Sequence, residues 1–179
     1  FFKKRNGIDM EKEWQKLGKE GVRIIVKDDE EYPEILKEIA KPPACLYVKG
    51  SLLPGEKYFA SVGTRWPSDY GKMVIDELIG YLSQNFTIVS GMARGIDSLS
   101  QKAVLSRGKR TIAVVGTGLD IVFPPENKKL EKEIENQGAT ISEFPLGVPS
   151  LPYNFPLRNR IIAGMSIGIL VTEGRARSG

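Results

Sequence analysis

The stretch SGMARGID at residues 90–97 follows directly on the apolar run FTIV at 86–89. Two other glycine turns, SVGTR at 61–65 and VGTGLD at 115–120, also close apolar runs. Glycine at a strand end lets backbone N–H groups come close to an anion. In a parallel sheet such strand ends lie together at one edge. Arg65 and Arg94, carried by two of the turns, favour a ligand that bears phosphate.

Outward from these turns, short apolar runs alternate with helical segments. The alternation indicates βαβ units, and hence an α/β fold with a mainly parallel sheet and helices on both faces. The strands are predicted at 22–26, 46–48, 58–62, 86–89, 111–115, 139–141 and 167–171. The helices are predicted at 10–18, 31–40, 68–83, 98–106, 126–136 and 158–165.

Composition narrows the function classes. The 179 residues carry a net charge of +4, which permits a nucleic-acid partner without requiring one. The absence of histidine excludes imidazole bases and His-ligated metals, and the single cysteine, Cys45, excludes a disulfide framework and is expected in the core. We therefore predict no metal. No apolar stretch approaches about 20 residues and no leader-like segment opens the chain, so we expect a cytoplasmic protein without a membrane span.

The glycine turns supply the first candidate site residues. Ser90, Gly91 and Arg94 are hard to explain structurally, whereas Asp97 suits a helix N-terminus and Ser98 with Gln101 matches a capping box. The structural alternative for each turn is a strand-to-helix connection that binds no ligand and carries an exposed arginine. The third turn fails as a dinucleotide fingerprint, because Ile121 stands where the last glycine belongs, so no cofactor is predicted. The predicted phosphate-turn glycines are Gly63, Gly95, Gly116 and Gly118.

The segment FPLRNR at 155–160 is the second candidate, because it brings an aromatic ring and two arginines to a helix start. Aromatic stacking and guanidinium–phosphate contacts are what single-stranded nucleic acid needs. The alternative is a core phenylalanine with solvated arginines. Arg158 and Arg160 are two residues apart, so at most one faces the ligand directly while the other braces it. Lys128, Lys129 and Lys132 alternate with glutamates and indicate a solvated helix face.

These motifs, in this order, resemble the DNA-processing protein A family (DprA, also called Smf). The resemblance runs from YPEIL at 32–36 through the glycine turns to FPLRNRIIAG at 155–164 and RSG at 177–179. It implies an extended Rossmann-like fold over 22–179 that stops short of the family's last core elements, with 1–21 as the end of a preceding helical segment. It also implies a homodimer that binds single-stranded DNA, protects it during natural transformation and passes it to the recombinase RecA. The implied DNA pocket comprises Arg65, Ser90, Gly91, Arg94, Phe155, Arg158 and Arg160.

One departure and two alternatives accompany this resemblance. The family commonly has a histidine where this chain has Gln101. The alternatives are a nucleotide-binding sensor and a nucleotide N-glycosidase like the related phosphoribohydrolases, which use a Pro-Gly-Gly-x-Gly-Thr loop that this chain lacks. Glu143 and Glu173 are the only carboxylates at suitable strand ends. We therefore expect a DNA-binding protein that is not an enzyme.

Overall fold

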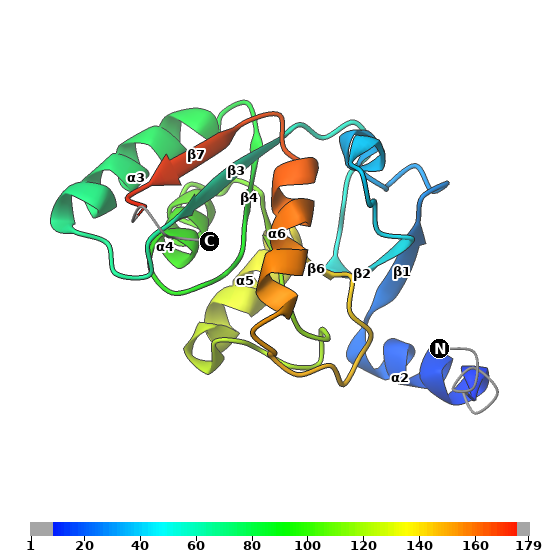
Figure 1. The fold of residues 1–179 in the computed structure, drawn as a ribbon. Helices are drawn as coiled ribbons and strands as arrows, with labels where there is room; N and C mark the ends of the chain where they lie inside the picture. The colour runs from blue at the N-terminus through cyan, green and yellow to red at the C-terminus, as the bar shows by residue number, and fades with distance from the viewer. Residues whose placement is uncertain (1–8, 175–179) are drawn as a thin grey trace.

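The computed structural model describes residues 9–174, which form one seven-stranded sheet in the order β1-β2-β6-β5-β4-β3-β7 (Figure 1). The five strands from β6 to β7 are parallel, while β2 pairs antiparallel with both β1 and β6. The predicted α/β fold with a mainly parallel sheet is confirmed. The strands are β1 Arg23–Val26, β2 Cys45–Gly50, β3 Tyr58–Gly63, β4 Thr87–Ser90, β5 Thr111–Val114, β6 Ala139–Ser142 and β7 Ile169–Thr172.

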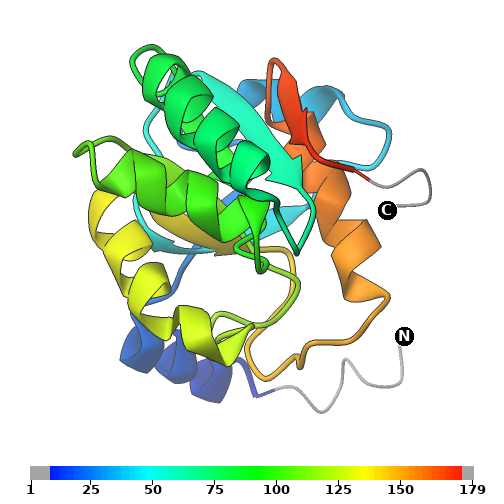
Figure 2. The same ribbon diagram turned by 90° about the vertical axis from the view of Figure 1, so that its left-hand side faces the viewer.

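Helices cover both faces of the sheet, as the apolar strands predict. Figure 2 shows α3, α4 and α5 side by side on one face and α6 on the other. Among residues 9–174, no helix combines the length and the apolar character that crossing a bilayer requires. The helices are α2 Met10–Glu20, α3 Asp69–Leu82, α4 Ile96–Leu105, α5 Lys128–Gln137 and α6 Asn154–Gly164, with short 3-10 turns η1 Glu34–Glu38 and η2 Pro125–Asn127.

The core forms where these layers meet. Every residue of β4, β5 and β6 is buried, because helices shield these central strands on both sides. Under α6, Ile161 and Met165 pack against the sheet together with Leu36 of η1. Cys45 is only half-buried in β2, not fully in the core as expected. By contrast, β7 is an edge strand whose Val171 side chain stays exposed.

Some helix predictions are wrong. The predicted helix at 31–40 is only the 3-10 turn η1, which follows Pro33 and ends at Ile39 in extended backbone. Five residues form too few hydrogen bonds to offset the unfavourable free energy of nucleating an α-helix. Helix α6 begins four residues before the predicted start at 158, because Pro156 lies in its first turn, where a proline is tolerated. The predicted division of the chain between residues 21 and 22 stays a prediction.

Candidate functional site

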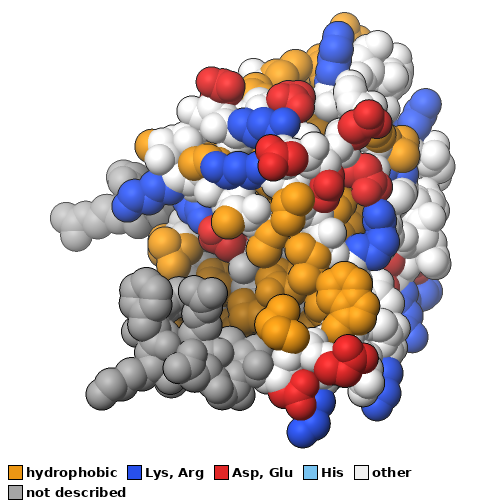
Figure 3. All heavy atoms as spheres, turned by 90° about the vertical axis from the view of Figure 1, so that its right-hand side faces the viewer, with side chains coloured by type: hydrophobic (Ala, Val, Ile, Leu, Met, Phe, Trp, Pro, Cys, Tyr) orange, Lys and Arg blue, Asp and Glu red, His pale blue; other side chains and the backbone are white. Residues whose placement is uncertain are grey.

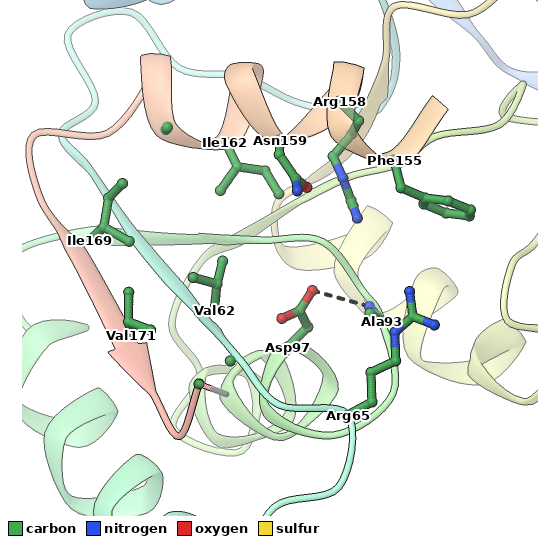
Figure 4. Close-up of a pocket in the computed structure, with 13 residues that line it drawn as sticks. Val62, Arg65, Ala93, Asp97, Phe155, Arg158, Asn159, Ile162, Ile169 and Val171 are labelled. Atoms are coloured by element: carbon green, nitrogen blue, oxygen red, sulfur yellow. Dashed lines mark hydrogen bonds between the residues drawn. The ribbon is translucent and has the colours of Figure 1, made fainter. Parts of the chain in front are cut away.

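A cavity of about 360 Å³ lies where the strand order reverses. From β3 the chain proceeds through β4, β5 and β6 to one side, whereas β7, reached through α6, pairs on the other side of β3. In open α/β sheets, ligands bind in this type of crevice, outside the carboxyl ends of the strands. Figure 4 shows side chains from β3, β7, α4 and α6 around the cavity. Its lining is Val62, Gly63, Arg65, Ala93, Asp97, Phe155, Arg158, Asn159, Ile162, Ala163, Ile169, Val171 and Gly174.

A second cavity, of about 180 Å³, adjoins the first. The two cavities share one wall, which consists of Arg65, Ala93, Phe155 and Arg158. The second is otherwise lined by Trp66, Gly91, Arg94, Phe123 and Pro124. Four of the predicted site residues, Arg65, Arg94, Phe155 and Arg158, thus come together from three separate segments of the chain, and Gly91 lies beside them.

The loop between β4 and α4 is folded around the carboxylate of Asp97. One Asp97 oxygen accepts hydrogen bonds from the backbone N–H groups of Gly91 (3.1 Å) and Ala93 (3.3 Å). Gly95 adopts a φ of +80°, and a β-carbon there would lie 2.3 Å from the carbonyl oxygen of Thr64. The loop therefore presses against the turn that follows β3. Two of its N–H groups donate to the carboxylate of Asp97 at the start of α4, where the helix dipole favours an acidic group.

The predicted capping box is wrong. Helix α4 begins at Ile96 with Gly95 as its N-cap, so Ser98 lies within the first turn instead of capping it. The Ser98 hydroxyl donates to the carbonyl oxygen of Ala93. Gln101 is fully buried, and its amide nitrogen donates to the carbonyl oxygen of Ile112 in β5 at 3.3 Å. Gln101, which stands where the family commonly has a histidine, lines neither cavity.

Arg158 is the buried cation of the shared wall, with 5% of its surface exposed. Its guanidinium donates to the carbonyl oxygens of Gly91 (2.7 Å) and Val114, so it ties α6 to the ends of β4 and β5. It also lies 5.9 Å from the centre of the Phe155 ring. Burial lowers the pKa of Arg158, an effect that the charge of Asp97 opposes. The Nε–H group of Arg158 is buried without a hydrogen-bond partner.

Arg65 is the exposed cation of the same wall. Figure 4 shows it on the turn after β3, across the cavity from α6. Within residues 9–174 it forms no ion pair. Its charge further lowers the pKa of Arg158, which means that the two guanidinium groups repel each other across open space. Because Asp97 is the only carboxylate among the described residues of the two cavity walls, the crevice carries excess positive charge and attracts an anion.

Arg94 and Phe155 complete the shared region. Arg94 is exposed and pairs with Glu126, itself exposed. An ion pair that is this exposed contributes little to stability, so a phosphate can replace the glutamate at little cost. The half-buried Phe155 packs against Phe123, with ring centres 5.6 Å apart, and gives both cavities an aromatic side. Gly116 makes room for this ring, because a β-carbon there would lie 3.2 Å from Phe155.

Other predicted site residues line neither cavity. Arg160 turns away from Arg158, as their spacing predicts, and donates to both oxygens of Glu143. The buried Ser90 hydroxyl donates to the carbonyl oxygen of Ser61 at 2.6 Å. Among the predicted phosphate-turn glycines, only Gly63 lines a cavity. Gly95, Gly116 and Gly118 instead pack against other parts of the protein. Their predicted contact with DNA stays a prediction.

The sequence reasoning missed two aromatic residues of the second cavity. Trp66 is 78% exposed and Phe123 is 39% exposed. A signal existed for each, because Trp66 directly follows Arg65 and Phe123 opens a Phe-Pro pair after the third glycine turn. The residues 177–179 that contributed to the resemblance lie outside the described part of the chain.

Comparison with known proteins places this geometry in a family. The model of the DNA recombination-mediator protein A family matches residues 23–179. DNA processing protein DprA of Streptococcus pneumoniae is 43% identical over 152 residues, which cover 84% of this chain and 54% of that protein. Protein Smf of Synechocystis is 42% identical over 166 residues, which cover 88% of this chain and 41% of that protein. The chain thus spans about half the length of the curated relatives it matches.

Solved structures give the same assignment. The X-ray structure of DprA from Streptococcus pneumoniae superposes with a TM-score of 0.88 at 38% identity, over 99% of this chain and 62% of that one. DNA processing protein A from Helicobacter pylori, whose structure concerns its single-stranded DNA binding mode, superposes with a TM-score of 0.78 at 28% identity, over 87% of this chain and 72% of that one. The chain therefore belongs to the DNA recombination-mediator protein A (DprA/Smf) family.

Proposed function

We propose that the crevice beside β3 and β7 binds the backbone of single-stranded DNA. The observation that carries this proposal is the pairing of Arg65 and Arg158 across an open cavity, with the ring of Phe155 on the same wall. Two repelling guanidinium groups are stabilised by an anion between them, and an aromatic neighbour suits a ligand that alternates phosphates with bases. Single-stranded DNA binding by the related Helicobacter pylori protein supports this choice of ligand.

The burial of Arg158 favours a single strand over a duplex. Only 5% of the surface of Arg158 is exposed, and its side chain lines the crevice between the turn after β3 and α6. A flexible strand can place one phosphate there and swing its bases aside, whereas a duplex keeps its bases paired and its backbone stiff. Binding through phosphates and ring faces reads little sequence, so similar affinities for different homopolymers are expected.

Membership of the family extends the proposal to the cellular role. We propose that the protein protects incoming DNA during natural transformation and delivers it to a RecA-type recombinase. It would do so in the cytoplasm, as a homodimer and without a cofactor. The support is the match of 23–179 to the recombination-mediator family and the relatives named for DNA processing.

We also propose that the protein catalyses no reaction on the strand. Glu143 is held by Arg160, and Glu173 accepts a hydrogen bond from the backbone N–H of Ser68 at 2.8 Å. Neither carboxylate lines a cavity. One observation favours the alternative of a nucleotide N-glycosidase: Asp97 faces the larger cavity, and burial raises its pKa. Its hydrogen bonds to Gly91 and Ala93, however, already give it a structural role.

Two assays on the same preparation test the proposal. The first measures the binding of labelled homopolymers and of a duplex over a salt series. We expect a preference for single strands and a log–log slope near −0.7 for each phosphate contact. A flat salt response or a preference for duplex contradicts the proposal. The second assay measures nucleobase release from nucleoside monophosphates. Release that disappears in Asp97→Asn would establish the glycosidase instead.

A further inference from the structure

We propose that Trp66 and Phe123 form a base-stacking subsite in the second cavity, next to the arginine pair. This subsite takes one nucleobase of the bound strand while the neighbouring phosphate lies between Arg65 and Arg158. The inference rests on the proposed function, because it assigns a further part of the same strand to a further part of the same crevice. It concerns side chains of this chain that neither the glycine turns nor the arginines account for.

Trp66 is the first observation. It follows Arg65 on the turn after β3, and 78% of its surface is exposed although it is among the largest apolar side chains. Its backbone N–H donates to the hydroxyl of Thr64 at 3.2 Å, which fixes the turn at the point where the indole leaves the backbone. The indole thus lines a cavity while most of its surface remains free for a ligand.

The shape and chemistry of the second cavity are the second observation. Besides Trp66, it is lined by the rings of Phe123 and Phe155 and by Pro124. The two phenylalanine rings are inclined by 40° and hold each other in place. At about 180 Å³, the cavity is smaller than the roughly 300–1,000 Å³ of pockets that enclose a whole small molecule. A flat ring system with two apolar faces fits this space better than a complete nucleotide does.

The shared wall is the third observation, because it fixes the order of the contacts along the strand. Arg65, Phe155 and Arg158 line both cavities, so a phosphate bound between the arginines lies at the entrance to the aromatic cavity. The base attached to that nucleotide, or to the next one, can then lie against Trp66 and Phe123. Arg94, on the rim of this cavity, is placed to meet a following phosphate. Stacking of this kind tolerates any base, because every base has a π-face.

The chain supplies a matched control. It has two tryptophans, and the other, Trp14 in α2, is 66% exposed. Trp14 lines a separate depression with Leu17 and Ile24. Figure 3 shows hydrophobic side chains gathered on the face that carries β1 and α2. Among the described residues that line this depression, Arg23 is the only cation, and it is paired with Glu31, unlike Arg65 in the crevice.

Intrinsic fluorescence provides the direct test. Trp14→Phe leaves Trp66 as the only tryptophan, and Trp66→Phe leaves Trp14. On titration with an oligothymidylate, we expect the emission of Trp66 to change and to saturate with binding measured by anisotropy of a labelled strand, while that of Trp14 stays constant. A silent Trp66 in a protein that binds the strand overturns the inference.

Affinity measurements separate stacking from other roles of the indole. Trp66→Ala is expected to weaken binding at least about fivefold, within the range of stacking on one base. Trp66→Phe should retain more affinity than Trp66→Ala, and Trp14→Ala should stay within about twofold of the parent. On an abasic strand, the parent and Trp66→Ala should bind alike. Equal loss on abasic and normal strands would show that Trp66 does not act on bases, which overturns the inference.

The outcomes also separate this inference from the proposed function. If the parent protein binds no single-stranded DNA, the proposed function itself fails. If the parent binds and Arg65→Ala weakens binding while Trp66→Ala does not, the function stands and the base subsite is wrong. Thermal melting of each variant, expected to match the parent because both tryptophans are exposed, excludes misfolding as the cause of a loss.

Discussion

Replacement of Arg65 by alanine isolates one DNA contact from the stability of the fold. The side chain is exposed and forms no ion pair within residues 9–174, so its loss should change the free energy of unfolding by less than about 0.5 kcal/mol. A charge-assisted hydrogen bond to a phosphate is worth about 1.5–3 kcal/mol. Because water competes at this exposed position, we expect the lower value, which corresponds to an affinity about tenfold weaker.

The assay is anisotropy of a labelled homopolymer at several salt concentrations. Loss of one phosphate contact should make the log–log salt slope shallower by about 0.7. Lys128→Ala and Lys132→Ala are the controls, because both lysines are exposed on α5 and line neither cavity. They should change affinity by less than about twofold, because neither lysine lines the crevice and an exposed charge outside it contributes little. If the lysine variants lose as much affinity as Arg65→Ala, or if the slope stays unchanged, the crevice is not the binding site.

Three further predictions concern the framework of the site. Arg158→Met should lower both DNA affinity and stability, the latter by about 1–3 kcal/mol in chemical denaturation for each buried carbonyl oxygen, of Gly91 and of Val114, that loses its donor; unchanged stability would argue against this role of Arg158. Gly95→Ala should cost at least about 2 kcal/mol, more than Gly55→Ala, because both glycines have positive φ but only a β-carbon on Gly95 meets a carbonyl oxygen; equal melting temperatures would contradict this. Burial raises the pKa of Glu131 from 4.5 to about 7, so the unfolded chain ionises first and stability is lost as the pH rises through that interval. Glu131→Gln should therefore melt higher than the parent at pH 8 and lose this advantage near pH 4.5, whereas a constant difference would show that ionisation is not the cause.

The regular part of the fold could be predicted from the sequence because each strand is a short apolar run next to a turn signal. The runs around Val89 and Val114 are buried on both faces, which is what an uninterrupted apolar stretch indicates. Helix starts were harder to predict. The motif formed by Ser98 and Gln101 mimics a capping box, but Gly95, with a φ of +80°, is the N-cap, and α4 starts two residues earlier than predicted.

The site could be predicted only in part, for a different physical reason. Arg65, Arg94 and Arg158 stand in local motifs that indicate phosphate binding without knowledge of the fold. The structure brings all three to one crevice. The orientation of Arg160 depends on its ion pair with Glu143, which lies in a different segment of the chain, directly after β6. Trp66 acquires its place beside Phe123 only when the turns after two different strands meet. Contacts between distant segments of this kind leave no periodic signal in the sequence.

Photocross-linking of a strand that carries 5-iodouracil tests the central claim most directly, because it locates the DNA on the protein. After irradiation and digestion, mass spectrometry identifies the linked peptides. The account predicts links in the peptides that contain Arg65 and Trp66, the loop at 91–97, and Phe155 with Arg158. An excess of unlabelled single strand should abolish these links. Links confined to the outer face of α5 or to α2, with none in the crevice, would contradict the claim that this crevice holds the strand.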